Sequence, residues 1–116
     1  MNLKPVLLCA SLLTTPGWAA NITYDTYVAH KNGPAMTGQL YGLAWGVMAA
    51  NGVMFNRTGQ KLFCIPDDVR IGSDFVGEIL DAEVKRSPNS RILPIENLYM
   101  GGIMAKYPCP TPAGQR

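Results

Sequence analysis

The sequence has few of the residues from which active sites and metal sites are usually built. It contains one histidine, His30, and three cysteines among 116 residues. It has no H-E-x-x-H motif, no phosphate-binding glycine loop and no nucleophile elbow. A lone histidine in a polar segment is usually a surface residue, and no serine stands in a pattern that would pair with it. We therefore expect no enzyme activity, no bound metal and no cofactor.

Charge is also scarce, and its two signs nearly balance. Ten Lys and Arg residues oppose eight Asp and Glu residues, which gives a formal net charge of +2. The basic residues do not cluster on any predicted face, so the electrostatic footprint of a nucleic-acid-binding protein is absent. The adjacent Asp67 and Asp68 have no further acid or histidine at ligand spacing, and the pair is typical of a solvated turn near a helix start.

The N-terminus has the pattern of a cleaved export signal. Lys4 precedes an apolar segment of roughly ten residues, which is too short to span a bilayer. Helix-breaking residues follow, and small residues then stand where a signal peptidase reads, so we predict that residues 1–19 are removed by cleavage after Ala19. Two alternatives stay open, namely lipidation at Cys9 and an uncleaved anchor. The expected location is the periplasm, with no stable membrane insertion after cleavage.

Export would leave two cysteines in a single domain of residues 20–116. An even number of cysteines in an oxidising compartment predicts a disulfide, here between Cys64 and Cys109. It would close a loop of about 45 residues and stabilise the fold by roughly 4 kcal/mol in the chain-entropy description. The long spacing is unlike a C-x-x-C redox motif, and one histidine does not complete a zinc site.

Helical periodicity accounts for most of the mature sequence, and no alternating strand pattern of useful length is present. After a short helix around residues 23–30, Pro34 opens a long apolar helix that is expected to run to about Met54. Turn-forming residues at 51–52 and 56–60 should end it. Residues 61–66 should be extended, because the residue before a proline avoids the helical region.

Two further helices complete the prediction. Residues 71–86 combine one apolar stripe with acids towards the start and bases at the end, as the helix dipole favours. Residues 87–90 should end this helix in an exposed loop. Pro94 opens a last helix, and residues 110–116 form a frayed tail. The predicted fold is all-α, a small bundle of three to four helices stapled by one disulfide.

Small residues recur every four positions in the long apolar helix, at Gly38, Gly42, Gly46 and Ala50. Each glycine costs a helix about 1 kcal/mol relative to alanine, so the stripe predicts the close approach of another helix. Membrane helices that dimerise share this pattern, but Gln39 and Asn51 inside the span favour a buried helix of a soluble domain. Gly101-Gly102 carries the same cost, and we expect it to pack closely, for instance against this stripe.

Several short motifs together resemble one family. In chain order they are Tyr41 to Val47, Phe63-Cys64-Ile65-Pro66, Val69, the 75–84 helix ending in Ser87-Pro88, Pro94 and Tyr107-Pro108-Cys109. They extend over residues 39–109 and are similar to the Rap/Tai group, small periplasmic immunity proteins that neutralise peptidoglycan amidase effectors delivered by type VI secretion. The resemblance implies a helical fold, the Cys64–Cys109 disulfide, a tendency to form homodimers and inhibition by blocking the effector's active-site cleft. This chain lacks the second cysteine pair that members often carry between their first two helices.

These observations favour binding over catalysis. We expect a periplasmic immunity protein that binds and inhibits a peptidoglycan amidase of type VI secretion. The alternatives are a periplasmic stress chaperone, a small binding protein with another partner, and an inner-membrane subunit held by the glycine-striped helix. For the partner-binding surface we select the turn after the amphipathic helix, with Asn89 and Arg91, and the polar face of that helix, with Glu83 and Lys85.

Overall fold

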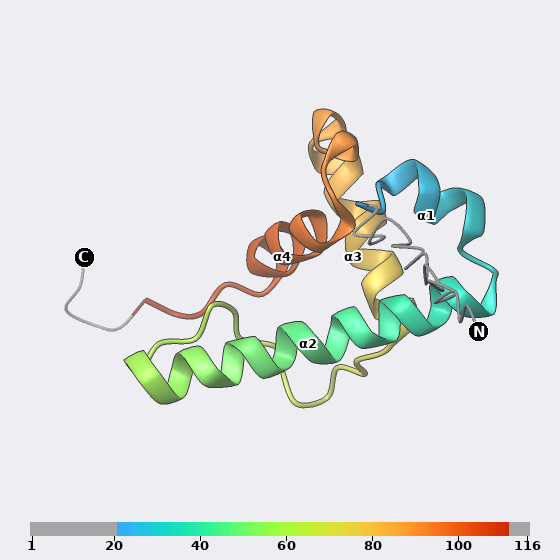
Figure 1. Cartoon of the computed structure of the whole chain (residues 1–116). Coiled ribbons are helices and arrows are strands. Elements are labelled where there is room, and N and C mark those ends of the chain that lie inside the picture. Colours follow the sequence, from blue (N-terminus) through green and yellow to red (C-terminus); the bar gives the residue numbers. More distant parts are fainter. Residues whose placement is uncertain (1–20, 112–116) are drawn as a thin grey trace, which may run out of the picture.

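Four α-helices and one 3₁₀ helix make up residues 21–111, the part of the chain that the computed structural model describes (Figure 1). They are α1 (Tyr24–His30), α2 (Pro34–Thr58), α3 (Ser73–Arg86), the 3₁₀ helix η1 (Pro88–Ile92) and α4 (Ile95–Lys106). The predicted all-α fold is therefore confirmed. Within the described part, β pairing is limited to a single antiparallel bridge between Thr23 and Pro94. The predicted signal segment, residues 1–19, lies outside the described residues.

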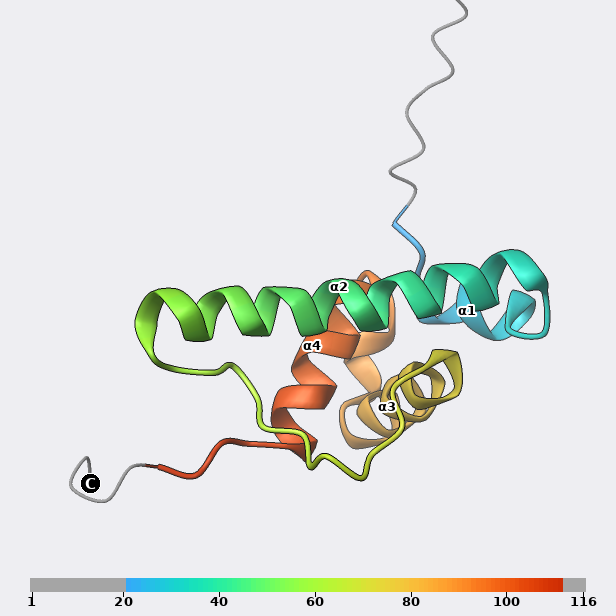
Figure 2. The ribbon, with the colours of Figure 1, turned by 90° about the horizontal axis from the view of Figure 1, so that it is seen from below.

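The longest helix, α2, lies along one edge of the molecule, with α3 and α4 to one side of it (Figures 1 and 2). It begins at Pro34. Proline lacks a backbone N–H, but the N–H at the first position of a helix has no acceptor within the helix, so nothing is lost there. It ends at Thr58 and is capped by Gly59, whose φ of 74° is left-handed and whose N–H donates to the Phe55 carbonyl at 2.8 Å. The expected end near Met54 was wrong, because the side chain of Asn51 turns inward and leaves the helical backbone intact.

The buried core is built around α3, which packs against α2, α4 and η1. Its apolar stripe meets apolar residues of α4 and Phe63 from the segment between α2 and α3. The fully buried large side chains are Tyr99, Phe63, Ile79, Leu80, Leu98, Ile103 and Val76. At one end of this core Phe75 packs edge-to-face on Tyr99, with ring centroids 6.3 Å apart and planes at 87°. The predicted amphipathic helix therefore buries its apolar stripe as expected, although it begins at Ser73 and not at residue 71.

A glycine allows α3 and α4 to approach each other closely. A Cβ placed on Gly102 would lie 2.6 Å from Ile79 Cγ2 and 3.3 Å from Glu83 Cβ. Gly102 is buried, whereas its neighbour Gly101 is exposed. The close packing expected at Gly101-Gly102 is thus present at Gly102. Its partner is α3, and the suggested packing against the small-residue stripe of α2 was wrong.

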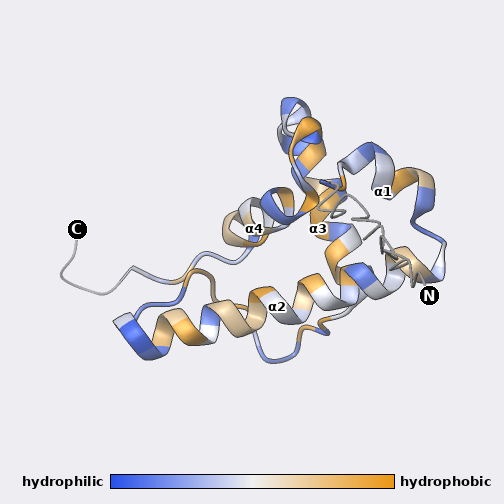
Figure 3. Ribbon diagram, viewed as in Figure 1, coloured by the Kyte–Doolittle hydropathy of each residue, from blue (hydrophilic) through white to orange (hydrophobic). Residues whose placement is uncertain are grey.

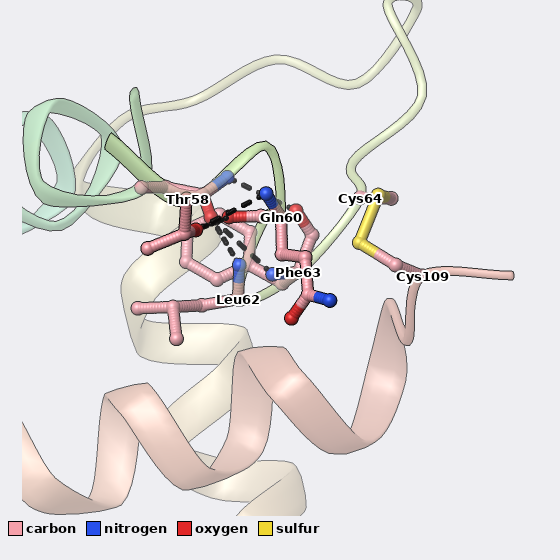
Figure 4. The surroundings of a disulfide bond; sticks show 7 residues. Thr58, Gln60, Leu62, Phe63, Cys64 and Cys109 are labelled. Atoms are coloured by element: carbon pink, nitrogen blue, oxygen red, sulfur yellow. Dashed lines mark hydrogen bonds between the residues drawn. A yellow bond between two sulfur atoms is a disulfide. The ribbon is translucent and has the colours of Figure 1, made fainter. Parts of the chain in front are cut away.

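The disulfide joins the end of α4 to the extended segment that follows α2 (Figure 4). Cys64 and Cys109 are bonded, with their Cα atoms 4.8 Å apart, so the predicted pairing is confirmed. A backbone hydrogen bond of 2.8 Å from the Cys64 N–H to the Tyr107 carbonyl runs beside it. The two segments are therefore held both covalently and through the backbone.

The same extended segment is fixed to α2 by one polar side chain. Asn51 is buried, its Nδ2 donates to the Phe63 carbonyl at 3.0 Å, and its Oδ1 accepts from the Leu62 N–H at 2.7 Å. Since a buried polar group is costly unless it is hydrogen-bonded, these bonds explain why an asparagine is tolerated in the core face of α2.

Candidate partner-binding surface

The described acids, cysteines and histidine do not gather into a metal-binding cluster. Among residues 21–111 no three His, Cys, Asp or Glu side chains lie close enough to hold a metal ion. Burial and a hydrogen bond to Asp81 raise the pKa of Tyr24 to about 12, and burial raises the pKa of Tyr99 to about 12. Both phenols therefore stay neutral at physiological pH, and Tyr24 serves as a donor to Asp81 at 2.8 Å.

The turn predicted to bind a partner is ordered by its own backbone. Where a loop was expected, residues 88–92 form the 3₁₀ helix η1, in which the Ser90 N–H donates to the Ser87 carbonyl at 2.9 Å. The Leu93 N–H in turn donates to Ser90 at 2.9 Å. Proline fixes φ at both ends of this segment, at Pro88 and Pro94. Asn89 is exposed on it. The turn therefore presents its side chains from a stiff base.

Arg91 is exposed and forms an ion pair with Asp25 of α1. The hydrogen bond to Asp25 is the main cause that raises the pKa of Arg91. Exposed ion pairs contribute little to stability, so this contact chiefly orients the guanidinium. Lys85 is exposed near the end of α3, where residues 87–92 follow directly. Three of the four predicted residues, Lys85, Asn89 and Arg91, therefore share one end of the molecule.

Glu83 does not belong to this exposed set, and its expected exposure was wrong. It is 8% exposed because α4 crosses α3 at Gly102, directly against the Glu83 Cβ. Its carboxylate accepts hydrogen bonds from Arg86 at 2.6 and 3.0 Å. Such a buried carboxylate needs this pairing, so Glu83 supports the α3–α4 contact from inside the fold.

Sequence reasoning missed the most exposed large apolar residue of the described chain. Ile92, at the end of η1, is 78% exposed, and Leu93 beside it is also exposed. An apolar pair that stands between Arg91 and Pro94, outside any periodic stripe, was the available signal. An interface needs an aromatic or aliphatic anchor near its centre, held on a rigid segment. The exposed tip formed by η1 thus combines the polar side chains of Asn89 and Arg91 with Ile92 as an apolar anchor.

Open grooves also lie elsewhere on the surface, and two of them lie at the two ends of α2. One of about 410 Å³ has an acidic wall of Asp74, Glu78 and Asp81 and faces Lys31. The other, of about 530 Å³, lies between the end of α2 and the segment after the disulfide, where the Lys61 ammonium stands 5.3 Å from the Phe55 ring centroid. The second groove contains no convergent set of groups that indicates a particular ligand.

The face of α2 that points away from the core was expected to be covered, and it is not. Gly38, Gly42 and Gly46 are all exposed, and a Cβ on any of them would meet no atom of the described chain within 4 Å beyond the nearby helix backbone. Each glycine costs this exposed helix about 1 kcal/mol relative to alanine with no packing in return. No helix among the described residues is both long and apolar enough to cross a membrane.

No family model, curated protein or solved structure matches this chain.

Proposed function

We propose that this protein is a periplasmic immunity protein that binds and inhibits a peptidoglycan amidase effector of type VI secretion. The observation that carries the proposal is how the motifs of the family resemblance meet. Phe63-Cys64 and Tyr107-Pro108-Cys109 are far apart in sequence, yet they form one unit through the disulfide and the 2.8 Å bond from Cys64 to Tyr107. Motifs that share a structural role are better support for kinship than motifs scattered over the surface.

The surface that would enter the amidase cleft is the tip formed by η1 and the residues beside it. Its backbone is hydrogen-bonded and flanked by prolines, so little conformational entropy is lost on binding. Ile92 supplies an exposed apolar anchor, and Asn89, Arg91 and Lys85 supply polar contacts around it. A rigid segment at one end of the molecule can enter a concave active site without changing its own backbone (Figure 1).

Export to the periplasm is part of this proposal, because the substrate of such an amidase is the cell wall. Cleavage after Ala19 would release the domain described here. Osmotic-shock release of a protein whose N-terminal sequence begins at Ala20 is the expected result. A chain that stays with the membrane fraction would contradict the proposed location.

The decisive experiment mixes the purified, oxidised protein with candidate type VI amidases and follows hydrolysis of peptidoglycan. We expect a stoichiometric complex with one amidase class and loss of its hydrolytic activity. A folded protein that binds none of these amidases would refute the proposal, and unfolding with protection of other proteins at low pH would favour the chaperone alternative.

A matched pair of variants tests the tip. Arg91→Glu and Asp25→Asn both break the same exposed ion pair, but only the first changes the proposed contact surface. We expect Arg91→Glu and Ile92→Asp to weaken inhibition by at least about tenfold, as loss of a central interface contact does. Asp25→Asn removes only the group that orients Arg91, so it should weaken inhibition by clearly less than either of these variants. Equal inhibition by all three would show that another surface binds.

A further inference from the structure

The groove of about 410 Å³ opens where α1, the start of α2 and the first turns of α3 meet, at one end of the molecule (Figures 1, 2 and 3). Its acidic wall consists of Asp74, Glu78 and Asp81, which are spaced four and three residues apart and therefore lie on one face of α3. Lys31 supplies the one cationic group among the described residues that line it, so three carboxylates and one ammonium leave a net charge of −2.

A buried tyrosine hydroxyl without a partner lies in the middle of this acidic face. Tyr27 of α1 is 5% exposed, and its hydroxyl makes no hydrogen bond to any of residues 21–111. A Cβ on Gly77 would lie 2.7 Å from this hydroxyl oxygen, so the glycine lets the phenol reach the floor of the groove. Burial raises the pKa of Tyr27, and the nearby carboxylates of Asp81 and Asp74 raise it further. Since buried polar groups usually have a partner, this hydroxyl points to a hydrogen-bonding ligand in the groove.

We propose that this groove binds a guanidinium group. Carboxylates only accept hydrogen bonds and a phenol oxygen can also accept them, so the matching ligand is a cation with N–H donors. An inorganic cation does not match, because no three acidic, cysteine or histidine side chains among residues 21–111 are close enough to hold a metal ion. A guanidinium presents several donors in one plane and is weakly hydrated, whereas an ammonium is compact and strongly hydrated. It can therefore bond to carboxylates on successive turns of α3 and to the Tyr27 hydroxyl together.

The affinity should be low, because the groove is open and its carboxylates are exposed. Exposed ion pairs each contribute little, and Lys31 competes for the same carboxylates. We expect a dissociation constant of roughly 1 mM at low salt that rises with ionic strength. The groove shares no lining residue with the η1 tip, so the inference does not depend on the proposed amidase.

Nuclear magnetic resonance titration of the isotope-labelled, oxidised protein tests the proposal, with Nα-acetyl-arginine amide as the probe. We expect saturable shifts of the Gly77 and Glu78 amide signals at probe concentrations up to roughly 50 mM. The citrulline analogue is neutral and nearly isosteric and should not produce these shifts, and the lysine analogue should bind at least about threefold more weakly. Absence of a saturable shift with the arginine probe, equal shifts with citrulline or equal affinity for lysine would overturn the proposal.

Two double variants that remove the same net charge locate the site. Asp74→Asn with Glu78→Gln neutralises two carboxylates of the groove, whereas Asp68→Asn with Glu96→Gln neutralises two exposed carboxylates outside it. We expect the first double variant to bind the arginine probe at least about tenfold more weakly and the second to stay within about twofold of wild type. Circular dichroism establishes that both fold.

Two single variants separate recognition from stability. Tyr27→Phe removes the unpartnered hydroxyl but keeps the buried ring, so it should weaken binding by about threefold without lowering thermal stability. Lys31→Gln removes the competing ammonium and should strengthen binding by about threefold. Unchanged binding in Tyr27→Phe and in the groove double variant would show that the probe binds elsewhere and would overturn the proposal.

The guanidinium can belong to a small molecule or to an arginine side chain of a protein, and a short peptide with one arginine among alanines distinguishes these sources. Binding at least about tenfold tighter than that of the arginine probe assigns the groove to a protein side chain. Equal binding of peptide and probe assigns it to a small guanidine. Failure of the peptide to bind a groove that binds the probe also assigns it to a small guanidine, and failure of both overturns the proposal.

Discussion

Asn51 makes the two hydrogen bonds that fix residues 62 and 63 against α2, so Asn51→Ala removes both at once. Each bond contributes about 1 kcal/mol net, and the partner groups left unpaired beside buried Phe63 add a desolvation cost of about 1 kcal/mol or more. The third contact, from the Phe63 N–H at 3.4 Å, is too long to add much. Better helix propensity of alanine returns about 0.5 kcal/mol. We expect a net loss of about 2 to 3 kcal/mol.

Urea and thermal unfolding of the oxidised protein measure this loss. For a domain of this size it corresponds to a fall in Tm of roughly 10 to 20 °C. Asn56→Ala is the matched control, because Asn56 is an exposed asparagine of the same helix, and we expect its effect to stay within about 0.5 kcal/mol. Hydrogen exchange adds a local readout, since the Leu62 amide is bonded to this side chain and should lose protection in Asn51→Ala.

Asn51→Asp separates the two bonds. The carboxyl keeps the acceptor for Leu62 but places a second oxygen against the Phe63 carbonyl, so burial and this carbonyl should raise its pKa in the folded protein. An acid whose folded pKa is raised binds more protons when folded, so the variant should gain stability relative to wild type as the pH falls through that pKa. Unchanged stability of Asn51→Ala together with a still-protected Leu62 amide would refute the reasoning.

Three further predictions concern packing, the disulfide and alkaline pH. Gly102→Ala should destabilise the fold by about 1 to 3 kcal/mol, because its Cβ would collide with α3. Gly101 is exposed, so Gly101→Ala should stabilise the fold by up to about 1 kcal/mol. Urea unfolding of the two variants measures both changes. Reduction of Cys64–Cys109 should lower the free energy of unfolding by about 2 to 4 kcal/mol, measured with and without reductant. The raised pKa of Tyr99, about 12 against 10.0, means that stability persists below pH 10 and falls as the pH rises from 10 to 12. Tyr99→Phe should reduce that fall. It should be neutral or stabilising at pH 7, because the buried hydroxyl has no hydrogen-bond partner among residues 21–111.

The helices and the disulfide could be predicted because local signals agreed with the global packing. Periodicity indicates the buried stripe of α3, and the prolines at residues 34 and 94 indicate where helices begin. The two cysteines of the mature domain indicate the disulfide by their number. The end of α2 could not be placed in this way. Asn51-Gly52 has turn chemistry, and only the distant Leu62 and Phe63 backbone makes an asparagine favourable inside the helix.

The candidate surface was predicted in part for a similar reason. The exposure of Asn89 and Arg91 could be predicted because a proline-bounded turn is exposed in most folds. Glu83 lies on the polar side of its helix by periodicity, but α4 crosses there, and a crossing point depends on the tertiary arrangement. The small-residue stripe of α2 indicates close packing without saying which helix supplies it.

The Thr23–Pro94 bridge brings the first described residues to the start of α4. The Tyr24–Asp81 and Asp25–Arg91 hydrogen bonds add contacts across 57 and 66 residues. The short α1 is therefore held by segments that lie far along the chain. Closing loops of this length costs conformational entropy before the contacts that stabilise the closed loop can form. We therefore expect this protein to fold more slowly than helical bundles whose neighbours in sequence are neighbours in space. Because α1 has seven residues and buries only Tyr27, while its contacts with Asp81 and Arg91 are exposed, it should be the first helix to detach when the native protein fluctuates.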